Sequence, residues 1–103
     1  MKKIFAVIVA YNHEKTLKQV YERIDKNFFN KVIIFDDCSA DNTFEIAKTL
    51  GCECYRNERN LGHGGNLKKS VNFAFKHGAD YVLEVHGDNQ YDPNDILKAK
   101  MFI

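Results

Sequence analysis

Residues 4–14 read Ile4-Phe-Ala-Val-Ile-Val-Ala10 and then Tyr11-Asn-His-Glu14. Seven consecutive apolar residues, without the alternation of a half-exposed strand, are typical of a strand buried on both faces of a parallel sheet. Lys2-Lys3 before the run gives it a faint likeness to a signal peptide, but the run is short and no small-residue cleavage site follows. We therefore predict a buried strand over residues 3–10.

Short apolar runs and amphipathic stretches alternate along the rest of the chain. We expect further strands at 31–35, 52–56 and 81–85, and helices at 14–29, at 42–50, at 66–77 and from Asp92-Pro93 onward. Asn42 and Glu45, three residues apart, resemble a capping box at the start of the second helix. Connections this short imply right-handed crossovers and a parallel sheet covered on both faces. The predicted fold is one α/β domain, a three-layer αβα sandwich with a mainly parallel sheet and strand order 3-2-1-4.

Composition excludes several classes of protein. The 103 residues are 45% hydrophobic, enough for one packed core, and the net charge of +1 lacks the basic excess of a nucleic-acid binder. No segment reaches the ~18 apolar residues of a membrane span. Three cysteines, an odd number, do not make a disulfide framework, and the lone Cys52-x-Cys54 offers too few ligands for a zinc site. We interpret the thiols as reduced and inert.

Polar clusters follow each predicted strand. In open parallel sheets, ligands bind beyond the carboxyl ends of the strands, so these clusters are expected to share one rim. They are Ala10-Tyr-Asn-His-Glu14, Asp36-Asp-Cys-Ser39, Arg56-Asn57 and His86-Gly-Asp-Asn-Gln90.

The last cluster suits a metal ion. His86, Asp88, Gln90 and Asp92 alternate along the chain, so several of them can point the same way in an extended turn. Mg²⁺ or Mn²⁺ is commonly held by one or two carboxylates, with substrate phosphates completing the shell. We predict that Asp88 is a ligand, whereas Asp92 before a proline is explained by a helix start.

Two further segments offer ligand groups. The adjacent carboxylates Asp36 and Asp37 repel each other, which favours a bound partner for at least one of them, a nucleobase N–H or a ribose hydroxyl; the alternative is a polar turn. The glycine-rich segment 60–66 could present backbone N–H groups to an anion. It completes neither a dinucleotide-binding fingerprint nor a P-loop, and a flexible turn explains it equally well. His63 within it could touch phosphate or lie in solvent.

Taken in order, four motifs resemble the family 2 glycosyltransferases, especially the polyprenyl-phosphate hexosyltransferase branch. The first motif, Val7-Ile-Val-Ala-Tyr-Asn-His-Glu14, corresponds to the family's V-I-P-A-Y-N-E-E, and the second, Phe35-Asp-Asp-Cys-Ser-Ala-Asp-Asn-Thr43, to V-D-D-G-S-x-D-G-T. The third, Asn60-Leu-Gly-His-Gly-Gly-Asn66, corresponds to N-x-G-K-G-x-A, and the fourth, His86-Gly-Asp-Asn-Gln-Tyr-Asp-Pro93, to D-x-D-G-Q-x-x-P. The resemblance spans nearly the whole chain and implies the nucleotide-binding half of a GT-A fold, which is Rossmann-like.

The resemblance also implies roles for residues. Tyr11 and Glu14 would line the base and ribose pocket, and Asp37, with Asp36, would read the base or ribose. Asp88 would hold the metal that bridges the diphosphate, with Gln90 beside it. The full expected donor-binding set is Ala10, Tyr11, Glu14, Asp36, Asp37, Asn60, Gly62, His63, Gly64 and Asp88, and the metal set is Asp88, His86 and Gln90.

Some positions depart from the family pattern. Val9 replaces the proline and His13 the first glutamate, and Cys38 and Asn42 replace glycines. His86 stands where the first acid of D-x-D belongs. Imidazole can bind Mn²⁺ but prefers softer ions than Mg²⁺, so the metal could be either.

Family members continue beyond the D-x-D motif into an acceptor-binding half that carries the catalytic base. Because residues 101–103 end the chain in an apolar run, we expect residues 1–103 to be the donor domain, truncated before that half, with no catalytic residue of its own. The surface meant for the missing half would then be apolar and prone to self-association.

The leading hypothesis is the donor domain of an inverting glycosyltransferase. It would bind a UDP- or GDP-sugar with Mg²⁺ or Mn²⁺ for hexosyl transfer to an acceptor, such as a polyprenyl phosphate, in the cytoplasm or at the cytoplasmic membrane face. The alternatives are a non-catalytic nucleotide-binding or interaction module and, less favoured, a nucleotidyltransferase, whose glycine-rich loop after the first strand is missing here.

Overall fold

The computed structural model describes residues 2–88 and 100–102. Its strands are β1 (Ile4–Ala10), β2 (Lys31–Asp36), β3 (Glu53–Arg56), β4 (Tyr81–His86) and β5 (Lys100–Phe102). Its helices are α1 (Leu17–Arg23), α2 (Thr43–Thr49) and α3 (Gly62–Lys76). None of the helices in the described part of the chain is long and apolar enough to cross a membrane.

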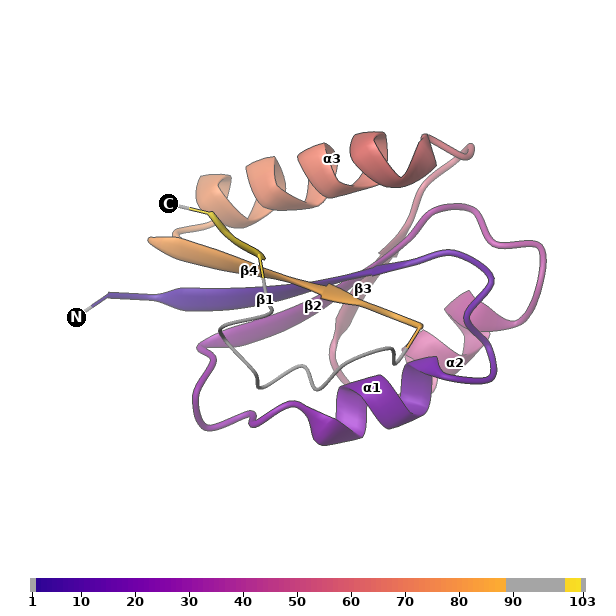
Figure 1. Ribbon diagram of the computed structural model, residues 1–103, viewed down its shortest axis with the longest axis horizontal. Helices are drawn as coiled ribbons and strands as arrows, with labels where there is room; N and C mark the ends of the chain where they lie inside the picture. The colour runs from indigo at the N-terminus through magenta and orange to yellow at the C-terminus, as the bar shows by residue number, and fades with distance from the viewer. Residues whose placement is uncertain (1, 89–99, 103) are drawn as a thin grey trace.

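The sheet confirms the predicted topology. Its strand order is β3-β2-β1-β4-β5, and the first four strands run parallel, so the predicted order 3-2-1-4 is present. Helix α3 covers one face of the sheet, and α1 and α2 cover the other (Figure 1). The three-layer αβα architecture follows directly.

Both faces of β1 lie in the core, which explains its unbroken apolar run. Ala6 and Ile8 pack into the cluster formed with α1 and α2, whereas Phe5 and Val7 pack into the cluster beneath α3. Because successive side chains of a strand point to opposite faces, a strand covered on both sides needs apolar residues at every position.

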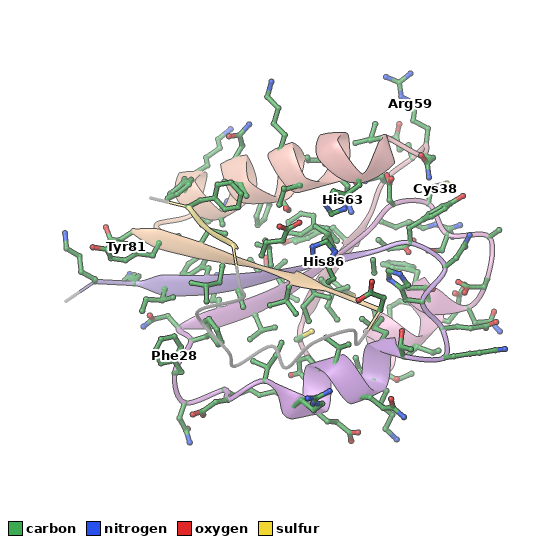
Figure 2. All side chains as sticks on the ribbon, viewed as in Figure 1. Phe28, Cys38, Arg59, His63, Tyr81 and His86 are labelled. Carbon is green, nitrogen blue, oxygen red and sulfur yellow. The ribbon has the colours of Figure 1, made fainter. Side chains whose placement is uncertain are left out.

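Helix α1 is shorter than predicted, since it ends at Arg23 rather than near residue 29. Ile24 already has an extended backbone, with ψ of 131°. The Asp25 carboxylate accepts a hydrogen bond from the Asn27 N–H at 2.9 Å, and such a local turn competes with helix continuation. Phe28, predicted to lie on the buried helix face, is therefore 42% exposed (Figure 2).

Two helix starts also differ from prediction. The capping box is wrong: the Asn42 side chain makes no capping hydrogen bond, and the Asp41 carboxylate instead accepts from the N–H of Thr43 at 2.9 Å. Helix α3 begins at Gly62, four residues before the predicted start, so most of the glycine-rich segment is helix rather than loop. Contacts from the end of β2, described below, fix this first turn against its low intrinsic propensity.

Strand β5 was not predicted. It pairs antiparallel with β4, with Val82 opposite Phe102, and the Phe102 side chain packs against the cluster beneath α3. Part of the apolar run at 101–103 is thus used within the sheet. The predicted helix from Asp92 and the predicted ligand Gln90 lie outside the described residues.

Candidate functional site

The loops that follow β1 and β2 are tied together at the carboxyl edge of the sheet. The Asn12 N–H donates to the Ser39 hydroxyl at 2.8 Å, and the Asn12 side chain accepts from the Ala40 N–H at 2.9 Å. The His13 N–H donates to the Thr43 hydroxyl at 2.8 Å. Asn12 has a φ of 56°, a left-handed conformation that asparagine tolerates. These contacts hold the rim in one shape.

The two adjacent carboxylates at the end of β2 have different surroundings. Asp36 is fully buried, accepts hydrogen bonds from the N–H and hydroxyl of Ser39, and lies 3.7 Å from the Arg56 guanidinium. Its contacts stabilise the turn after β2. Cys38 in that turn has a φ of 61°, a backbone region that favours the glycine of the family pattern.

Asp37 holds the start of α3. Its Oδ1 accepts from the Leu61 N–H at 2.8 Å and from the Asn57 amide at 2.9 Å. The same Asn57 amide also donates to the Asn66 side-chain oxygen at 3.0 Å, and the Asn66 amide donates to the Phe35 carbonyl at 3.0 Å. Asn57 and Asn66 are buried; the sequence placed Asn57 on the rim and Asn66 in the glycine-rich segment but assigned neither of them a role. This network joins the ends of β2 and β3 to the first turns of α3.

A cavity of about 310 Å³ opens between the carboxyl ends of the strands and the first turn of α3. Tyr11 stands at its edge with 46% of its surface exposed. The residues of the predicted donor set that line it are Ala10, Tyr11, Asp37, Asn60, Gly62 and His63, and they are joined by Val9, His13, Asn66 and His86. Six predicted residues from three separate motifs therefore meet in one cavity.

Glu14 and Asp88 lie elsewhere on the rim. Both border a second cavity of about 330 Å³ that also contacts Asp41. Glu14 accepts a hydrogen bond from the Asn42 N–H at 3.3 Å. His13 borders both cavities, and burial lowers its pKa below 6.5. Glu14, which the resemblance placed with Tyr11 at the base and ribose, therefore borders the cavity of Asp88 instead, and His86 borders the cavity of Tyr11.

The remaining predicted residues fall outside the first cavity. Gly64 borders an apolar groove with Leu67, Val71 and Phe102. Asp36 lies beneath the turn as described above.

Gly87 permits a close approach between β4 and the loop after β1. A Cβ atom at this position would lie 2.6 Å from the His13 Nδ1 and 3.3 Å from the Ala10 Cβ. The Gly87 N–H donates to the Val9 carbonyl at 3.1 Å, which continues the pairing of the two strands. The glycine thus lets His13 pack over the end of β4.

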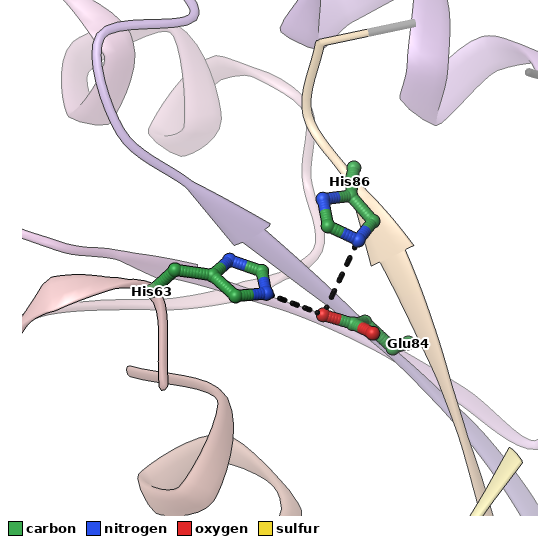
Figure 3. Close-up of side chains that lie close together, drawn as sticks. All are labelled: His63, Glu84 and His86. Carbon is green, nitrogen blue, oxygen red and sulfur yellow. Dashed lines mark ion pairs between the residues drawn. The ribbon is translucent and has the colours of Figure 1, made fainter. Parts of the chain in front are cut away.

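A second polar cluster, drawn in Figure 3, borders the same cavity through His63 and His86. The Glu84 Oε2 is 3.1 Å from the His63 Nε2 and 3.3 Å from the His86 Nε2. The two imidazoles are stacked, with ring centroids 4.9 Å apart. The hydrogen bond with Glu84 raises the pKa of His86.

Sequence reasoning missed Glu84, although a signal was available. It is an acid within the apolar strand β4, and it lies two residues before His86 and so on the same face.

The sequence profile of Glycosyl transferase family 2 matches residues 5–103 of the chain. The chain belongs to this family. The resemblance stated from the four motifs is confirmed.

Relatives in the family are longer than this chain. The UDP-N-acetylglucosamine–dolichyl-phosphate N-acetylglucosaminyltransferase of Methanococcus voltae is 33% identical over 115 residues, which cover 95% of this chain and 46% of that protein. The chain thus spans about half the length of this relative.

Solved structures share the fold. A structure of Staphylococcus aureus TarS 1-349 in complex with UDP is 28% identical, with a TM-score of 0.66 over 84% of this chain and 27% of that one. The glucosyl-3-phosphoglycerate synthase of Mycobacterium tuberculosis, determined with Mn²⁺, UDP and phosphoglyceric acid, is 23% identical, with a TM-score of 0.73 over 84% of this chain and 33% of that one. The second likeness is one of fold alone.

Proposed function

We propose that this chain is the donor-binding part of an inverting glycosyltransferase and that the nucleoside of a UDP-sugar occupies the 310 Å³ cavity. The observation that carries the proposal is the meeting of six predicted donor residues in this one cavity. Its volume is at the lower end of the ~300–1,000 Å³ typical of small-molecule sites, which suits a nucleoside with the diphosphate and sugar extending outward.

Asp37 and Tyr11 are the residues we assign to the base and ribose. Both hydrogen bonds described for the Asp37 carboxylate end on Oδ1, so its other oxygen is the one we assign to an N–H of the base or a ribose hydroxyl. The half-exposed ring of Tyr11 is placed to stack on the base, an interaction worth about 1–3 kcal/mol.

We favour uracil as the base. The Methanococcus voltae relative is named for a UDP-linked donor, and the TarS structure was determined with UDP. The names of the first relative and of Staphylococcus aureus poly(ribitol-phosphate) beta-N-acetylglucosaminyltransferase TarS both include a phosphate-bearing acceptor. We therefore propose a phosphate-bearing acceptor here, with dolichyl phosphate as the first to test.

Asp88 is the residue we assign to Mg²⁺ or Mn²⁺. It borders the second cavity together with the carboxylates of Glu14 and Asp41, and an oxygen-rich rim fits these hard cations. His86 directs its Nε2 to Glu84 and so turns that atom away from this role. A bound cation would neutralise the charge of the leaving diphosphate.

The chain's own residues bind and orient the donor. Asp37 and Tyr11 hold the nucleoside, and the first turn of α3 lies over it. The base that accepts the proton of an acceptor hydroxyl is not assigned to any described residue, and we place it in an acceptor-binding half.

Calorimetric titration tests the proposal. We expect wild-type chain to bind UDP more tightly than GDP, and Mn²⁺ to strengthen UDP binding in wild type but not in Asp88→Ala. Equal, metal-independent binding of both nucleotides would contradict the assignment. Absence of any binding would leave two explanations, a site completed only by an acceptor-binding half or an interaction module that holds no donor.

A further inference from the structure

The cluster of His63, Glu84 and His86 borders the 310 Å³ cavity through its two histidines and uses none of the carboxylates assigned above. His63 is in the first turn of α3, and Glu84 and His86 project from the same face of β4 (Figures 2 and 3). The His63 Nε2, the Glu84 Oε2 and the His86 Nε2 all lie within 4.8 Å of one another. His63, which lies at least 21 positions before the other two residues, thus joins them to bring three potential ligand atoms together.

The separations between these atoms fit a shared ion. Zinc lies ~2.0–2.2 Å from nitrogen and oxygen ligands, and a tetrahedral shell of that radius places neighbouring ligand atoms roughly 3.4 Å apart. The two distances from the Glu84 Oε2, 3.1 and 3.3 Å, are close to that value. The third separation is the one between the ligand atoms of the two histidines. The side chain of His63 is 56% exposed, so its ring can move to shorten that separation.

Burial adds a second argument. Glu84 is only 3% exposed, and a buried carboxylate is costly unless a positive charge compensates it. His86, whose pKa the hydrogen bond with Glu84 raises, supplies that charge when it is protonated. A divalent ion would compensate the carboxylate while both imidazoles stay neutral, which is their form as metal ligands.

We propose that His63, Glu84 and His86 bind a divalent transition metal ion, with Zn²⁺ as the favoured ion. Two imidazoles and one carboxylate favour such ions over Mg²⁺, whose ligands are oxygen atoms. His63 and His86 both line the 310 Å³ cavity, so the coordination position left by three protein ligands faces it. A water molecule or a phosphate oxygen can occupy that position.

Equilibrium dialysis against Zn²⁺ without nucleotide tests this site independently of the donor assignment. We expect one equivalent to bind per wild-type chain, and the affinity to fall at least about tenfold in His63→Ala and in Glu84→Gln. His77→Ala is the matched control, since His77 is an exposed histidine at the other end of α3 and should leave the affinity unchanged.

The variants suit the test. His63 is more than half exposed, and glutamine keeps the shape of Glu84, so circular dichroism should show folded chains. No saturable Zn²⁺ binding to wild type, or equal affinity in His63→Ala, would overturn the proposal. Zinc held by Cys52 and Cys54 would survive His63→Ala and would overturn it in the same way.

Discussion

Replacing Asp37 by alanine should destabilise the fold strongly, because this carboxylate holds the start of α3. Two hydrogen bonds end on its Oδ1, from the Leu61 N–H at 2.8 Å and the Asn57 amide at 2.9 Å. Hydrogen bonds to charged groups contribute about 1.5–3 kcal/mol each. Asn57 keeps the Asn66 oxygen as an acceptor at 3.0 Å, so part of the second contribution survives.

We therefore expect Asp37→Ala to lower the free energy of unfolding by about 3 kcal/mol, out of the 5–15 kcal/mol typical of a domain. For a domain of this size, each 1 kcal/mol shifts Tm by roughly 4–8 °C, so Tm should fall by about 12–24 °C. Asp37→Asn keeps an oxygen at the Oδ1 position and should cost less than about 1.5 kcal/mol. Urea and thermal unfolding measure both. A cost below about 1 kcal/mol for Asp37→Ala would refute the reasoning.

Three further predictions concern single residues. Gly62 has a φ of +78°, so Gly62→Ala should lower the free energy of unfolding by about 1 kcal/mol, whereas Gly64→Ala in the same helix turn should raise it slightly. Urea unfolding that finds Gly62→Ala more stable than Gly64→Ala would contradict this. Burial raises the pKa of Cys52 to about 11, so at pH 8 iodoacetamide should modify it at least about a hundredfold more slowly in the folded than in the unfolded chain, followed by mass spectrometry. Burial lowers the pKa of His13 below 6.5, so the stability that its neutral form contributes is present above pH 6.5 and is lost as pH falls through the lowered pKa. NMR titration measures this pKa, and a midpoint at or above 6.5 would be incompatible with the packing of His13.

Most of the sheet could be predicted because β1, β2 and β4 contain runs of residues that are buried on both faces. The unbroken apolar run of β1 follows from packing against helices on both sides, and the short connections leave little freedom in strand order. The start of α3 could not be predicted from local propensity. Glycines disfavour a helix, and the distant Asp37 carboxylate and the Asn57–Asn66 network fix that turn together with the Asn60 side chain.

The candidate site was predictable in composition but not in arrangement. The motifs named Asp36 and Asp37 together, yet only the structure shows that Asp36 accepts from Ser39 beneath the turn while Asp37 lines the cavity. Similarly, Asp88 and His86 are two residues apart but border different cavities. Such differences depend on side-chain directions at the strand ends, which residue spacing alone does not determine. The predicted self-association through an apolar face stays a prediction.

The most direct test of the central claim is the affinity of UDP for Asp37→Asn beside the matched remote variant Asp80→Asn. Asp80 accepts a hydrogen bond from the Lys3 N–H just before β4, at the opposite edge of the sheet from the cavity. Loss of a hydrogen bond to a charged group should weaken UDP binding about 10- to 150-fold in Asp37→Asn. Asp80→Asn should bind as wild type does. Equal affinities in all three chains, with Asp37→Asn folded, would show that UDP does not occupy this cavity.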